Sequence, residues 1–69
     1  MIISEMEYKG ERRRIRIERH RRIFSNFYLY IDGEEGFHLI RVCDGCLKSD
    51  RLEQKTLDII EWVMVAAFQ

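Results

Sequence analysis

The segment Phe27–Cys43 has the sequence FYLYIDGEEGFHLIRVC and decides the predicted fold. Its first five and last seven residues are rich in aromatic and β-branched side chains, which favour strands. The intervening DGEEG contains two glycines, as is typical of a connection between paired strands. We therefore predict an antiparallel hairpin that closes over Glu34 and Glu35.

This closure predicts which residues share a face of the sheet. The inner face should hold three pairs: Phe27 with Val42, Leu29 with Ile40, and Ile31 with His38. The outer face should hold three others: Tyr28 beside Arg41, Tyr30 beside Leu39, and Asp32 beside Phe37.

A second hairpin is predicted before this one. Apolar and charged residues alternate in Arg14–Glu18 and, less regularly, in Ile2–Tyr8, and Lys9-Gly10-Glu11 between them can form a tight turn. The predicted inner face carries Met6, Tyr8, Ile15 and Ile17, and the outer face carries Glu5, Glu7, Arg14, Arg16 and Glu18. We expect Glu7 to face Arg16 across this hairpin. The segment Arg19–Ser25 can be a loop, a bulge or a continuation of the strand.

The period changes to 3.6 residues after a predicted turn at Cys43–Cys46. Asp50 with Glu53 resembles a capping box, and Ser49 is a competing N-cap. The predicted apolar stripe of this helix comprises Leu52, Thr56, Ile59, Ile60, Val63 and Ala67. The expected fold is α+β: one domain over residues 1–69, with a four-stranded antiparallel sheet of two consecutive hairpins packed on one C-terminal helix.

Length and charge limit the possible functions. A chain of 69 residues can bury only one core, which excludes separate cofactor and substrate domains. The net charge is zero, from 12 basic and 12 acidic residues, yet the stretch from Lys9 to Arg22 has eight bases against two acids and carries +6. This asymmetry indicates either a surface for polyanions or internal ion pairing.

The sequence gives several indications of location. The first five residues lack the basic and apolar regions of a signal peptide, and the longest apolar run, Trp62–Phe68, is far shorter than a membrane span. Two cysteines are too few for a disulfide framework, which agrees with a reducing compartment. We expect a cytoplasmic protein that does not bind membranes.

The basic stretch is the strongest functional signal. Arginine forms bidentate bonds to phosphate, and aromatic faces beside arginines are surfaces on which bases stack. The predicted nucleic-acid-binding residues are Arg12, Arg14, Arg16, Arg19, Arg21, Arg22, Tyr28, Tyr30, Phe37 and Arg41. The alternative is that glutamates on the first strand neutralise the middle of the stretch and leave a basic corner at Arg12, Arg19, Arg21 and Arg22.

The Cys43-Asp44-Gly45-Cys46 turn can supply half of a tetrahedral zinc site. His38 lies five residues before Cys43 on the same predicted strand, so its side chain points to the opposite face and cannot complete the site. Zinc is therefore expected only if two chains share a site through Cys43 and Cys46. The simpler interpretation is two ordinary cysteines and no cofactor.

No catalytic motif is present: the chain has no phosphate loop, no paired-carboxylate signature and no evident nucleophile beside either histidine. We expect a non-enzymatic binding module. Its alternative function is a protein-interaction module or inhibitor that docks through Trp62, Val65 and Phe68 or through a sheet edge. The partner would be a second copy of the chain or an acidic protein surface that meets the arginines.

Overall fold

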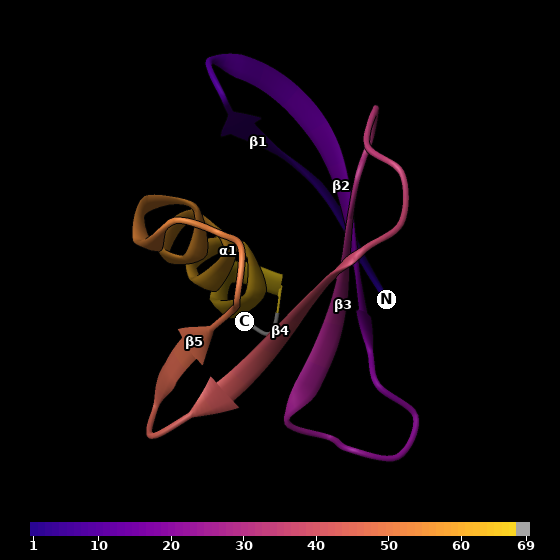
Figure 1. The fold of residues 1–69 in the computed structure, drawn as a ribbon, viewed down its shortest axis with the longest axis vertical. Helices are drawn as coiled ribbons and strands as arrows, with labels where there is room; N and C mark the ends of the chain where they lie inside the picture. Colours follow the sequence, from indigo (N-terminus) through magenta and orange to yellow (C-terminus); the bar gives the residue numbers. More distant parts are fainter. Residues whose placement is uncertain (68–69) are drawn as a thin grey trace.

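The computed structural model describes residues 1–67, which form five strands and one helix. The elements follow the chain as β1 (Ile2–Tyr8), β2 (Glu11–Arg19), β3 (Asn26–Ile31), β4 (His38–Cys43), β5 (Cys46–Lys48) and α1 (Gln54–Ala67). The sheet is antiparallel in the order β1-β2-β3-β4-β5, so each strand pairs with its neighbour in the chain. It curls around α1 (Figure 1). The predicted class, an α+β fold with one C-terminal helix, is confirmed, with five strands in place of four.

The additional strand is β5, which the sequence analysis did not predict. Asp44 and Gly45 have φ angles of 53° and 77°, as a two-residue hairpin turn of the primed type requires. The chain therefore turns back at the predicted position, and Cys43 and Cys46 become direct neighbours on β4 and β5.

The first hairpin has a tighter turn than predicted. Lys9 and Gly10 alone make it, with φ angles of 51° and 78°, and Glu11 already belongs to β2. Glu7 therefore lies opposite Arg12, and the expected Glu7–Arg16 pair is wrong. The predicted faces are nevertheless correct, because the difference in register is an even number of residues.

The second hairpin also differs in register, by two residues. Phe27 pairs with Ile40 and Leu29 with His38, because the connection between β3 and β4 spans residues 32–37 rather than Glu34 and Glu35 alone. The predicted outer pairs change accordingly: Tyr28 lies opposite Leu39, Tyr30 lies beside Phe37, and Arg41 lies opposite Asn26. The faces are again those predicted, except that Val42, although on the inner face, is exposed at the end of β4.

Twelve side chains form the core between the sheet and α1. They are Met6, Tyr8, Ile15, Ile17, Phe27, Leu29, Ile31, Ile40, Leu47, Leu57, Ile60 and Met64. The predicted stripe on the helix is displaced toward Leu57 and Met64, which are buried, while Ile59 and Val63 are partly buried. The displacement arises because α1 packs against both β1 and β5, so the curled sheet covers a wide sector of the helix.

The helix also begins later than the predicted caps. The backbone N–H of Leu57 donates to the carbonyl of Glu53 at 3.1 Å, which makes Glu53 the N-cap in place of Ser49 or Asp50. Trp62 and Val65 are exposed, as expected from their position on the helix. Phe68 lies outside the described residues.

Candidate nucleic-acid interface

The outer face of the sheet carries the predicted aromatic and basic side chains. Because Ile15, Ile17 and Leu29 point into the core, the residues between them point outward. The register of β2 and β3 places Arg16 opposite Tyr30 and Glu18 opposite Tyr28. The part of the basic stretch on β2 and the predicted aromatic side chains on β3 are thus direct neighbours.

Four rings on this face form a continuous series, which we call the aromatic row: His20, Tyr28, Phe37 and Tyr30. The ring centroids of His20 and Tyr28 are 5.3 Å apart, those of Tyr28 and Phe37 are 4.8 Å apart at 74°, and those of Tyr30 and Phe37 are 6.0 Å apart. The guanidinium carbon of Arg16 lies 4.2 Å from the centroid of Tyr30. Phe37 is 54% exposed, so the row has an accessible ring at its centre.

The rest of the outer face is mixed. Leu39 is exposed opposite Tyr28, and Arg41 lies between Asn26 and Lys48. Arg41 is paired with Asp50, with 3.4 Å between Nη2 and Oδ1. Arg41 therefore adds a cation at the end of the row, though one that already has an acidic neighbour.

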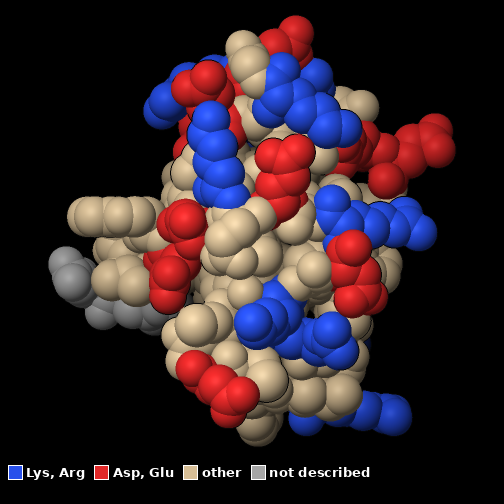
Figure 2. All heavy atoms as spheres, turned by 60° about the vertical axis from the view of Figure 1, so that its left-hand side comes forward, with Lys and Arg blue, Asp and Glu red and all other residues tan. Residues whose placement is uncertain are grey.

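Local ion pairs neutralise part of the basic stretch, but only one of the carboxylates involved, Glu5, lies on the first strand, where the alternative interpretation expected them. Arg12 Nε lies 3.2 Å from Glu5, and Arg16 Nε lies 3.5 Å from Glu18. Arg14 lies opposite Glu5 in the sheet. Figure 2, which views the molecule from the side of α1, shows basic and acidic side chains interspersed on that side.

Four arginines of the basic stretch have no acidic partner within 4.0 Å among residues 1–67: Arg14, Arg19, Arg21 and Arg22. The last three form what we call the basic corner. Arg12, which was expected in this corner, is instead paired with Glu5. The corner lies at the lower end of the sheet in Figure 1, at the end of β2 and in the loop to β3. Arg19 turns toward the inner face, where its guanidinium carbon lies 5.4 Å from the centroid of Phe27, so only Arg21 and Arg22 extend from the loop.

Arg13, which was not among the predicted site residues, lies on the inner face. It donates to the carbonyl of Asp32 at 3.0 Å and pairs with Glu11 at 2.6 Å, while its Nε is buried without a partner. These contacts hold the β3–β4 connection against β2. Arg13 is therefore a structural residue.

The sequence analysis missed a second polar cluster, at the other end of the molecule. Tyr8 donates from its hydroxyl to Glu34 at 3.0 Å, and His38 Nε2 donates to the other oxygen of Glu34 at 2.8 Å. The hydrogen bond from His38 is the main cause that lowers the pKa of Glu34, and burial is the main cause that raises the pKa of Tyr8. The spacing of four residues between Glu34 and His38 was the available signal.

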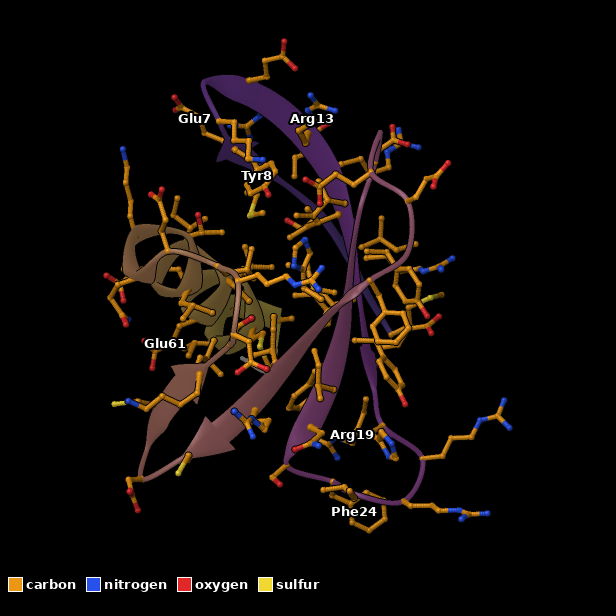
Figure 3. The ribbon with its side chains drawn as sticks, viewed as in Figure 1. Glu7, Tyr8, Arg13, Arg19, Phe24 and Glu61 are labelled. Atoms are coloured by element: carbon orange, nitrogen blue, oxygen red, sulfur yellow. The ribbon has the colours of Figure 1, made fainter. Side chains whose placement is uncertain are left out.

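This cluster borders a cavity of about 440 Å³ between the first turn, the β3–β4 connection and the start of α1. Tyr8 is labelled there in the upper part of Figure 3. The side chains of Lys9, Arg51 and Lys55 also line the cavity. Both oxygens of Glu34 are already engaged, so the cluster primarily ties the β3–β4 connection to the end of β1 and the start of β4.

The two cysteines are exposed and free. The thiol of Cys43 donates to Asp44 Oδ2 at 3.8 Å. Within residues 1–67 no group of three or more histidine, cysteine, aspartate or glutamate side chains is arranged to hold a metal ion. His38 lies on the inner face and Cys43 on the outer one, as predicted from their spacing. A zinc site shared between two chains stays a prediction.

The predicted partner-binding surface around Trp62 and Val65 lies beside β1. Trp62 is 76% exposed, and Ile3 and Val65 are exposed near it. A shallow groove lined by Ile2, Ile3, Ser4, Trp62, Val63, Ala66 and Ala67 separates β1 from α1.

Comparison of the chain with protein-family models, curated proteins and solved structures finds no match. In the described part of the chain, no helix has the length and apolar character that crossing a membrane requires.

Proposed function

We propose that this chain is a non-enzymatic nucleic-acid-binding module that holds a strand across the outer face of its sheet. The aromatic row is the observation that carries this proposal. Rings that contact one another in series beside a guanidinium offer platforms for successive bases, and base stacking tolerates any sequence because every base has a π face.

The arginines supply the contacts to phosphate. Neither Arg21 nor Arg22 is paired with a carboxylate among residues 1–67, so binding a phosphate there adds a favourable interaction without breaking an existing ion pair. Arg12 and Arg16 would exchange a glutamate for a phosphate, which contributes less. With Arg14 included, about three phosphates are neutralised, and the logarithm of the binding constant should fall with that of the salt concentration with a slope of about −2 for a single strand.

The test is fluorescence anisotropy with labelled single-stranded and duplex probes between about 50 and 200 mM salt. Replacing both Arg21 and Arg22 by Ala should reduce the slope by about 1.4, since each phosphate contributes about 0.7. Phe37→Ala should weaken binding by about 5- to 150-fold, the effect of one lost base stack, and leave the slope unchanged.

Two exposed residues of α1 provide matched controls. Trp62→Ala removes an exposed ring and Lys55→Ala removes an exposed cation, both away from the outer face of the sheet. Neither should alter binding. Absence of affinity for both probes at low salt would refute the proposal. An acidic protein partner would require the arginines without the rings, so Phe37→Ala would leave its capture unchanged.

The second candidate function is self-association through β1 and α1. Among the described residues β1 pairs only with β2, so its other edge offers free backbone groups beside the exposed side chains of Ile3 and Trp62. A second copy of the chain is the proposed occupant, because this edge and the adjacent apolar surface can pair with their own equivalents about a two-fold axis. Sedimentation should show a dimer that Trp62→Ala weakens and Phe37→Ala does not. A monomer at every concentration would contradict this candidate.

A further inference from the structure

The loop between β2 and β3 exposes two large apolar side chains at its tip. Phe24 is 71% exposed and Ile23 is 51% exposed, directly after Arg21 and Arg22. Figure 3 shows Phe24 at the lower end of the molecule, on the loop and away from the helix. Large apolar side chains that are adjacent and exposed usually mark a contact surface.

This loop has a defined shape. The Nδ1 atom of His20 accepts hydrogen bonds from the backbone N–H groups of Arg22 and Ile23, both at 3.1 Å. The N–H of Asn26 donates to the carbonyl of Ile23 at 3.0 Å. The apolar tip is therefore presented by a structured turn, which lowers the entropy that binding has to overcome.

Two further hydrogen bonds fasten the loop to the sheet. The N–H of His20 donates to the carbonyl of Asn26, and the N–H of Val42 donates to the carbonyl of Ser25, both at 2.8 Å. The loop is thus attached to both β3 and β4. Its tip has a fixed position relative to the outer face.

The loop is also continuous with the aromatic row. His20 is at once the acceptor that shapes the loop and the first ring of the row, where it contacts Tyr28. A strand that stacks along the row would reach the loop next, at Arg21 and Arg22. An apolar side chain flanked by arginines is the arrangement with which proteins wedge between base steps.

We infer that Phe24, supported by Ile23, is a wedge that inserts beside or between two bases, while Arg21 and Arg22 hold the phosphates of that step. This inference rests on the proposed nucleic-acid function and specifies its ligand class: nucleic acid with a base step that opens at low cost, as in a single strand or at an unpaired junction of a duplex.

The decisive probe is an oligonucleotide with 2-aminopurine placed at each position in turn, because the fluorescence of this base reports its stacking. Binding of the unaltered protein should change the fluorescence strongly at one position. Phe24→Ala should abolish that change and weaken binding by about 5- to 150-fold. The substitution should leave the fold intact, which far-UV circular dichroism can verify, because most of the Phe24 side chain is exposed.

Two other variants separate the roles within the loop. Replacing Arg21 and Arg22 by Ala should weaken binding but preserve the fluorescence change at saturating protein. His20→Ala should reduce both the affinity and the fluorescence change, although Phe24 remains, because the loop loses the hydrogen-bond acceptor that shapes it. Lys55→Ala, which removes an exposed cation on α1, should alter neither the affinity nor the fluorescence change.

The outcomes distinguish this inference from the function on which it rests. If the unaltered protein binds no probe, the nucleic-acid function fails. If it binds and Phe24→Ala changes neither affinity nor fluorescence, the function stands and the wedge is refuted. Vesicles of phosphatidylcholine and phosphatidylserine form the last arm: binding to them that depends on Phe24, without an effect on oligonucleotides, would assign the loop to a membrane surface and overturn the inference.

Discussion

Replacing Glu34 by Gln should test whether the polar cluster stabilises the fold. Glu34 accepts from Tyr8 on one oxygen and from His38 on the other, and it is partly buried. Gln keeps the shape but presents an acceptor to only one of these donors. A hydrogen bond to a charged group contributes about 1.5 to 3 kcal/mol, and partial exposure reduces this, so we expect a loss of about 1 to 2 kcal/mol. In a domain of this size each kcal/mol lowers the Tm by about 4 to 8 °C.

The pH dependence gives the same prediction a second test. The pKa of Glu34 is lowered in the folded protein, mainly by the hydrogen bond from His38, so its contribution is complete above the ordinary value of 4.5. That contribution is lost as the pH falls through the lowered value. The difference in the free energy of unfolding between the variant and the unaltered protein should therefore be full at neutral pH and should shrink as the pH falls below 4.5.

Urea unfolding followed by far-UV circular dichroism measures both effects. Glu35→Gln is the matched control, since it makes the same change of charge at the exposed neighbouring residue. Tyr8→Phe removes one donor only and should cost about half as much as the change at Glu34. Equal unfolding midpoints for the two Gln variants at neutral pH would refute the reasoning, as would a deficit for Glu34→Gln that persists unchanged at about pH 3.

Two further features can be tested by substitution. Gly33→Ala should destabilise the fold by about 1 to 3 kcal/mol, because φ is +91° and the added methyl would collide with the guanidinium of Arg13. Gly36 also has positive φ, but a methyl there meets open space. Gly36→Ala should therefore lower the free energy of unfolding by less in the same urea experiment. If two chains share a zinc ion, native mass spectrometry of fresh protein should show a zinc-linked dimer, and Ser at either Cys43 or Cys46 should remove the metal. Zinc-free monomers in the unaltered protein would contradict that site.

The faces of the sheet could be predicted from the sequence, but the registers could not. Alternation with period two assigns Ile15 and Ile17 to the core however far a partner strand slides, provided that it slides by an even number of residues. The register depends on the length of each turn. Lys9 adopts positive φ, which is uncommon outside glycine, and the two-residue turn that results sets the register of the first hairpin.

The two missed features had little local signal. With only three residues, β5 is too short to display alternation, and it forms because the Asp44-Gly45 turn directs it back along β4. The contact between Tyr8 and Glu34 joins residues 26 positions apart and depends on the path of the β3–β4 connection. The aromatic row was anticipated as a set of outward residues, but the part played by His20 depends on where β2 ends.

The order of the strands has a consequence for how the chain is made. Every strand pairs with the one synthesised just before it, so the sheet can grow step by step as the chain leaves the ribosome. Among residues 1–67, however, the element that covers the core is α1, and its Leu57, Ile60 and Met64 are among the last of these residues to be synthesised. Until then the inner face of β1 and its neighbours is open to water and to other nascent chains. The period between the emergence of β1 and the docking of α1 is thus when this protein most needs protection from aggregation.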